Sequence, residues 1–254
     1  MRLFFTFLMA VGLAHSVQAT EVVLTSKNTV VMDQAFRASS VAQVQNKLAK
    51  LSANTNEDLY LILNSPGGSI SAGQSLIDFA KSLPNKVHTI TVFAASMAYL
   101  TAQHLDKRYI LPSGKMMSHR ARIGGLGGQV PGEANTRLSF ITSIVDEIFA
   151  STAKRVGVSF EEYMGLVYDE LWLTANQAVK TNHADEVIVA KCDKSLSGTY
   201  VRTVRSFFGN FKVTFSKCPL INGPLKIHTS NTTVKKYLEK KLNHSSRKNF
   251  TLTL

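Results

Sequence analysis

Between residues 21 and 190 the chain alternates short apolar segments with segments of helical spacing, and this alternation limits the fold more than any other feature. The apolar segments have the length and composition of buried strands. Strands that alternate with helices predict an α/β fold with mostly parallel strands. The predicted strands are 21–32, 58–63, 87–93, 108–111 and 186–190. The predicted helices are 38–51, 70–83, 97–105, 132–155, 159–167 and 174–181.

The first 19 residues have the pattern of a targeting segment. Arg2 precedes an apolar run of eleven residues, Leu3 to Leu13, and Val17-Gln18-Ala19 offers compact residues before a cleavage point. Since a bilayer requires about 20 apolar residues, this run is too short to span one. We therefore expect residues 1–19 to be a signal peptide cleaved after Ala19, which makes the protein exported, periplasmic or secreted.

The net charge of +12 is concentrated near the C-terminus. Residues 191–254 carry thirteen Lys and Arg but only two acidic residues, so residues 20–190 form a nearly neutral body and 191–254 a basic appendage. We expect the appendage to be a solvated tail or to contact an anionic surface such as membrane headgroups. Residues 234–242 could form a short basic helix. No nucleic-acid partner is expected of an exported protein.

Two cysteines, Cys192 and Cys218, flank the segment TYVRTVRSFFGNFKVTF. Apolar and polar residues partly alternate in this segment, and Gly209-Asn210 stands at its centre. This pattern predicts a β-hairpin. In an exported protein a pair of cysteines at the feet of a hairpin is a plausible disulfide, and the alternative is two free thiols.

A serine interrupts the apolar stretch VFAASMAYL at Ser96, directly after a predicted strand. Taken alone, it is a small residue that allows close packing. A catalytic serine would need a base, an orienting acid and amide donors for the oxyanion. His119 follows another predicted strand, and Gly67 and Gly68 follow a third, so these residues meet at the carboxyl edge of the sheet. No G-x-S-x-G motif supports an α/β-hydrolase.

Five segments, in order, resemble the proteolytic subunit of the Clp protease. They are LYLILNSPGGSISAG, VFAASMAYL, KRYILPSGKMMSHR, GGLGGQ and DELWLTANQAVKTNHADEVI. That family consists of serine peptidases with the crotonase-like fold of repeated ββα units. The resemblance covers residues 21–190 and implies an endopeptidase that acts on peptides or unfolded proteins, assembles as a homo-oligomer and needs no cofactor. No spacing typical of metal ligands is present.

The resemblance assigns roles to single residues. Ser96 matches the family's nucleophile and His119 its general base. The backbone amides of Gly68 and Met97 match the oxyanion hole. The residues implied in binding the substrate strand are Gly67, Gly124 and Gly125.

The acid of the triad is ambiguous. The position that matches the family's aspartate holds Glu170, and Asp169 stands one residue earlier. Either Glu170 orients His119 or a bulge brings in Asp169; both could also only cap the helix after Thr174. Asn182 replaces a turn glycine of the family, and Asn tolerates the positive φ that such a turn requires.

Three alternatives remain open. Lys107 or Lys115 could act as the base of a serine–lysine dyad, as in signal-peptide peptidases of the same fold. The chain could be a non-catalytic scaffold that binds anionic surfaces through residues 191–254. An acyl-CoA enzyme also fits the fold, but an exported protein would rarely meet CoA. Export also removes ATP and an unfoldase, so the expected activity is ATP-independent.

Overall fold

The computed structural model describes residues 20–124, 127–206, 209–228 and 236. Its centre is a six-stranded sheet in which β2, β3, β4 and β5 run parallel, as the alternation predicts. β6 pairs antiparallel with β5, and β7 pairs parallel with the first part of β5. The strands of this sheet are β2 (Thr29–Met32), β3 (Leu59–Ser65), β4 (Val87–Ala95), β5 (Arg108–Ser118), β6 (Leu171–Thr174) and β7 (Glu186–Val187).

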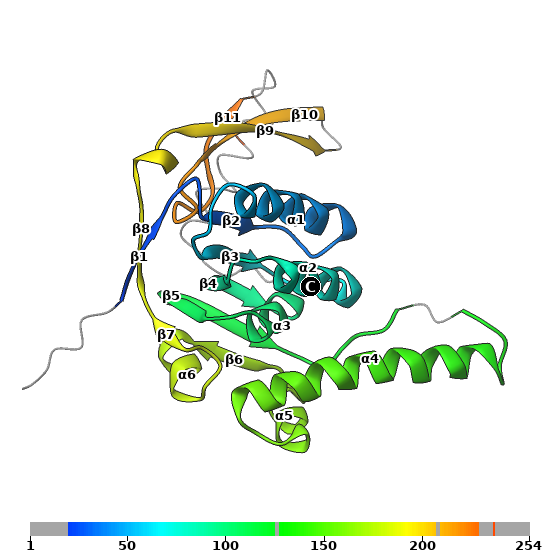
Figure 1. The fold of residues 1–254 in the computed structure, drawn as a ribbon. Helices are drawn as coiled ribbons and strands as arrows, with labels where there is room; N and C mark the ends of the chain where they lie inside the picture. The colour runs from blue at the N-terminus through cyan, green and yellow to red at the C-terminus, as the bar shows by residue number, and fades with distance from the viewer. Residues whose placement is uncertain (1–19, 125–126, 207–208, 229–235, 237–254) are drawn as a thin grey trace, which may run out of the picture.

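The helices lie on one side of the sheet, and α4 extends away from the body at one corner (Figure 1). The described helices are α1 (Ala38–Ser52), α2 (Ile70–Ser82), α3 (Met97–His104), α4 (Glu133–Val156), α5 (Phe160–Leu166) and α6 (Ala175–Lys180). These positions confirm the helical spacing of the sequence. Only the last turns of α4 have buried side chains, from Ile148 to Val156, and the helix ends where Gly157 adopts the left-handed conformation.

The opposite face of the sheet is covered by a two-stranded parallel pair, β1 (Glu21–Leu24) and β8 (Val189–Cys192). Its side chains Val22 and Leu24 form a small core with Ile62 and Ile90 of the central strands. The larger core lies between the sheet and the helices. Burial on both faces explains why the central strands are continuous apolar runs in the sequence.

β5 corrects one prediction. The sequence predicted a short strand that ends before Pro112, but β5 continues to Ser118. The register with β4 jumps from Ile110 opposite Thr91 to Lys115 opposite Phe93, so a bulge lifts residues 111–114 out of the ladder. A proline is tolerated at such a bulge because its missing N–H is not needed for pairing.

The C-terminal sheet confirms the predicted hairpin and adds a strand. It is antiparallel and lies above α1 in Figure 1. Its strands are β9 (Thr199–Ser206), β10 (Gly209–Ser216) and β11 (Pro224–His228), and a short 3₁₀ helix, η1 (Lys194–Leu196), precedes them. Gly209 and Asn210 pair with Ser206 and Arg205 of β9 instead of forming the expected turn. Residues 207–208, which connect the two strands, lie outside the described residues.

A disulfide joins Cys192, at the end of β8, to Cys218, just after β10. It fixes the foot of the C-terminal sheet to the body, as the sequence suggested. The predicted signal peptide (1–19) and all but Lys236 of the predicted basic helix (234–242) lie outside the described residues. Within the described part of the chain, no helix has both the length and the apolar character required to cross a bilayer.

Candidate active site

Three strand ends meet at the predicted site. Ser96 directly follows β4, and its amide donates to the carbonyl of Met117 in β5 at 2.8 Å. His119 is the first residue after β5. In the antiparallel ladder between β5 and β6, Ser118 is opposite Leu171. Continuing this register by one residue places Glu170 opposite His119, so the sheet brings all three residues to one edge.

Ser96 has an unusual backbone. Its φ of 55° and ψ of −120° lie outside the regions that residues other than glycine normally occupy. Such a conformation costs on the order of 1–3 kcal/mol and persists only where the surroundings enforce it. Here β4 enters the turn from the sheet, and Leu100 donates to the Ser96 carbonyl at 3.0 Å to begin α3. A serine that served only as a small packing residue would not need this strained turn.

The glycine turn after β3 packs directly on the Ser96 turn. Gly67 has a φ of 88°, and a Cβ there would come within 2.5 Å of the Ala95 carbonyl and 2.7 Å of the Met97 amide nitrogen. Only glycine fits this position, because it combines the left-handed backbone with close approach. Gly73 of α2 leaves similar room for the side chain of Met97, which is fully buried.

Two amides at this junction are available as donors. The Gly67 amide donates to Ser65 Oγ at 3.1 Å and is therefore occupied. Among the residues that the structure describes, no hydrogen bond uses the amide of Gly68 or of Met97. Met97 is the first residue of α3, where the amides have no partner within the helix. These two amides are the pair that the sequence predicted for the oxyanion hole.

The side chain of His119 is partly exposed and faces its own loop. Its Nδ1 lies 2.5 Å from the carbonyl oxygen of Arg120. The hydrogen bonds of the described residues include none from His119 to Ser96, Glu170 or Asp169. The fold thus brings Ser96 and His119, the predicted nucleophile and the predicted base, to neighbouring strand ends, and their side chains make no hydrogen bond with each other in the described conformation.

Glu170 contacts two residues that the sequence did not single out. The Trp172 indole donates to its Oε2 at 3.0 Å, and the guanidinium of Arg122 lies 3.5 Å from its Oε1. Glu170 precedes β6 and Trp172 lies within it, so the period-two pattern of a strand does not cover both residues, and no sequence pattern predicted their contact. Glu170 itself has a φ of 76°. Asp169 is exposed, and its choice as an alternative acid stays a prediction.

Two of the glycines predicted to bind the substrate strand, Gly124 and Gly125, follow His119 in the chain. Gly124 is exposed and has open space around it, and Gly125 lies outside the described residues. Within the described part of the chain, no group of three or more His, Cys, Asp or Glu side chains is arranged to hold a metal ion.

Comparison with known proteins agrees with this geometry. The family model described as Clp protease matches residues 12–191, which is more than half of the chain. The chain belongs to the Clp protease family. Its members are serine-type endopeptidases, so the strained serine of the β4–α3 turn lies in a fold that carries this chemistry. The match ends at Lys191, next to the predicted boundary of the basic appendage.

Clp protease relatives cover the body at moderate identity. A proteolytic subunit 2 of the ATP-dependent Clp protease from Tropheryma whipplei is 29% identical over 65% of this chain and 92% of its own length. A subunit 1 from Streptomyces avermitilis is 32% identical over 65% of this chain and 77% of its own. A subunit 3 from Streptomyces coelicolor is 34% identical over 61% and 72%, respectively.

The two lysines considered as alternative bases, Lys107 and Lys115, lie at different distances from Ser96. The Lys107 carbonyl accepts from Thr89, seven residues before Ser96, so Lys107 lies at the far end of β4, roughly 20 Å away. The structure therefore excludes Lys107 as the base. Lys115 pairs with Phe93 in the ladder and is much nearer the Ser96 turn.

Proposed function

We propose that the mature protein is an exported serine endopeptidase that cleaves peptides or unfolded proteins without ATP. The observation that carries this proposal is the strained Ser96 turn beside the amides of Gly68 and Met97, which have no hydrogen-bond acceptor among the described residues. A serine presented in this way can attack a carbonyl whose oxygen enters the space between the two donors. The membership of the Clp protease family supports the same reaction class.

In the proposed mechanism one proton moves from Ser96 to His119 and then to the leaving amine. With Nδ1–H of His119 donated to an acceptor, its Nε2 is free to take the Ser96 hydroxyl proton as Oγ attacks the substrate carbonyl. The imidazolium then protonates the leaving amine, which leaves an acyl group on Ser96 Oγ. A water molecule, deprotonated by His119, then attacks this ester and releases the acid product and free Ser96. In the described conformation the acceptor is the Arg120 carbonyl. We propose that Glu170 replaces it when the site is assembled, because the register places Glu170 opposite His119.

Two features support export. Residues 1–19 have the pattern of a signal peptide, and the Cys192–Cys218 disulfide is of a kind that persists in oxidising compartments. The relatives are named as ATP-dependent subunits, but ATP is not available outside the cytoplasm. We therefore propose that this peptidase works on substrates that need no energy-driven unfolding.

Assembly as a homo-oligomer is part of the proposal. The first half of α4 extends from the body with Leu138 44% and Phe140 66% exposed. Apolar side chains on a projecting helix are typical of a surface that a second subunit covers.

The basic appendage, residues 191–254, adds a surface for anionic headgroups, and sedimentation with anionic vesicles at low and high salt would test that contact.

The test uses residues 20–254, oxidised and purified. A quenched fluorescent peptide and an unfolded protein substrate are incubated with and without ATP. Cleavage of both without ATP, lost in Ser96→Ala, is the expected result. If neither is cleaved, or if cleavage survives Ser96→Ala, the proposed activity is wrong. His119→Ala separates the candidate bases, since full activity in that variant would favour Lys115.

A further inference from the structure

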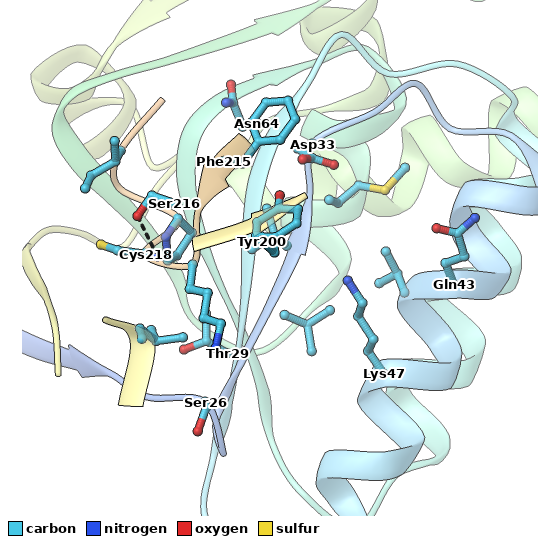
Figure 2. A pocket seen from close by; sticks show the side chains of 18 of the residues that line it. Ser26, Thr29, Asp33, Gln43, Lys47, Asn64, Tyr200, Phe215, Ser216 and Cys218 are labelled. Carbon is cyan, nitrogen blue, oxygen red and sulfur yellow. Dashed lines mark hydrogen bonds between the residues drawn. The ribbon is translucent and has the colours of Figure 1, made fainter. Parts of the chain in front are cut away.

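A cleft lies between the body and the C-terminal sheet, and Ser96 and His119 are not among the residues that line it. Its volume is about 770 Å³, within the range of ligand-binding pockets. Its floor is the continuous stretch Thr29 to Gln34, which includes all of β2. α1 forms one wall, and β9, β10 and the loop after Cys218 form the others. Figure 2 shows Tyr200 and Phe215 of these strands opposite α1.

The floor of this cleft is an unpaired strand edge. In the part of the chain that the structure describes, β2 is the last strand of the central sheet and β3 is its one partner. Tyr60 donates to the Asn28 carbonyl, so the next residues that bond β3 are Val30 and Met32. In a parallel ladder the intervening residues, Thr29 and Val31, turn their backbone groups to the other side. No hydrogen bond among the described residues reaches those groups.

The walls carry an excess of positive charge. Arg202 is paired with Asp33 at 3.5 Å and lies over the stacked rings of Tyr200 and Phe215. Three lysines line the cleft without an ion pair among the described residues: Lys47, Lys50 and Lys217. The Lys47 side chain reaches from α1 toward the middle of the cleft in Figure 2.

We propose that this cleft binds an extended acidic peptide segment of another protein, which adds a strand to the free edge of β2. An open edge offers main-chain hydrogen bonds that only an extended backbone can complete. The three lysines select acidic side chains along it. The chain's own C-terminal tail is a poor occupant, because residues 237–254 carry Lys240, Lys241, Arg247 and Lys248 against Glu239.

The site would recruit a partner or a substrate segment without taking part in the chemistry at Ser96. It depends on the appendage, which the Clp protease match does not cover, and on the disulfide that fixes the appendage to the body. It therefore stands independently of the proposed peptidase activity.

The test measures fluorescence anisotropy of a labelled hexapeptide, Glu-Val-Glu-Val-Glu-Val. The protein is oxidised 20–254 with Ser96→Ala, so that cleavage cannot remove the peptide. We expect saturable binding that a Lys-Val repeat does not show. Lys47→Glu with Lys50→Glu weakens binding at least about tenfold. Lys180→Glu, an exposed lysine on α6 away from the cleft, changes it by less than about twofold.

Backbone methylation of the peptide tests the added strand directly. N-methyl groups on the three Glu or on the three Val residues block opposite edges of an extended peptide. One of these two peptides should bind at least about tenfold more weakly, and the other within about threefold of the parent. Equal affinities for both methylated peptides would overturn the proposal, as would binding that free glutamate displaces equally well, which would mean a simple anion pocket.

Discussion

Gly67 and Ser96 are packed so closely that a methyl group on Gly67 would lie 2.7 Å from Ser96 Cβ. The two residues belong to different strand–turn–helix units, so their contact couples the glycine turn to the strained serine. Gly67→Ala cannot keep both turns in place, since the backbone of Gly67 also has a positive φ.

We predict that Gly67→Ala lowers kcat/KM for a peptide substrate by at least about 10², the scale of losing one oxyanion donor. Gly165→Ala is the matched control, because a Cβ at Gly165 meets open space within helix α5. That variant should keep its activity and gain a few tenths of a kcal/mol to about 1 kcal/mol in stability. Similar activity in the two variants would show that the packing at Gly67 does not matter for catalysis.

The acid can be assigned by paired amide variants. Glu170→Gln should lower kcat by about 10² to 10⁴, because in the proposed mechanism the Glu170 carboxylate fixes the tautomer of His119. Asp169→Asn should stay within about threefold of the parent, since the register of β5 and β6, continued by one residue, sets Glu170 and not Asp169 opposite His119. Steady-state kinetics across pH on the same peptide checks both. The reverse ranking would mean that a bulge brings Asp169 to His119.

His183 predicts a loss of stability in mild acid. Burial, helped by the charge of Arg108, lowers its pKa to about 4, and its Nδ1 lies 2.6 Å from the hydroxyl of Tyr99. In the unfolded chain His183 has a pKa of about 6.5. Between pH 6.5 and 4 this histidine is therefore protonated in the unfolded state and neutral in the folded state. The free energy of unfolding should therefore fall by about 3 kcal/mol as pH drops through this window.

Urea unfolding at several pH values between 7.5 and 4 measures this decline. His183→Gln should flatten it, although the variant starts less stable because Tyr99 loses its partner. His228→Gln, which changes an exposed histidine on β11, is the control for removal of one imidazole. An unaltered slope in His183→Gln would assign the acid sensitivity to other groups.

The disulfide should stabilise the C-terminal sheet more than the body. It closes a loop with a sequence separation of 26, for which chain entropy gives about 3.5 kcal/mol. Cys192→Ser with Cys218→Ser should speed amide hydrogen exchange in β9, β10 and β11, while β3 and β4 stay protected. Peptide hydrolysis should be retained. Equal loss of protection in both sheets would show that the appendage and the body unfold together.

The sequence predicted the features that depend on local pattern. Strand β3 has the continuous apolar sequence of a buried parallel strand because both of its faces are covered. Asn182 adopts the positive φ, 58°, that a glycine in this turn would have. The features it did not predict depend on distant partners. β5 continues past Pro112 only because β4 and β6 hold it beyond the bulge. β11 exists because β10 offers an edge.

The site shows the same division. Strand ends and the glycine turn follow from sequence pattern, so the meeting of Ser96 and His119 at one edge of the sheet could be expected. The contact of Glu170 with Trp172 and Arg122 could not, because it depends on how the loop after β5 folds back against β6.

Labelling with a fluorophosphonate probe shows directly whether Ser96 is a nucleophile that depends on His119. Oxidised protein of residues 20–254 is treated with the probe, and the modified residue is located by peptide mass spectrometry. We predict an adduct on Ser96 that disappears in His119→Ala, since a serine hydroxyl needs a base to become a good nucleophile. An adduct that persists in His119→Ala, or no adduct at any pH between 5 and 9, would contradict a Ser96–His119 pair.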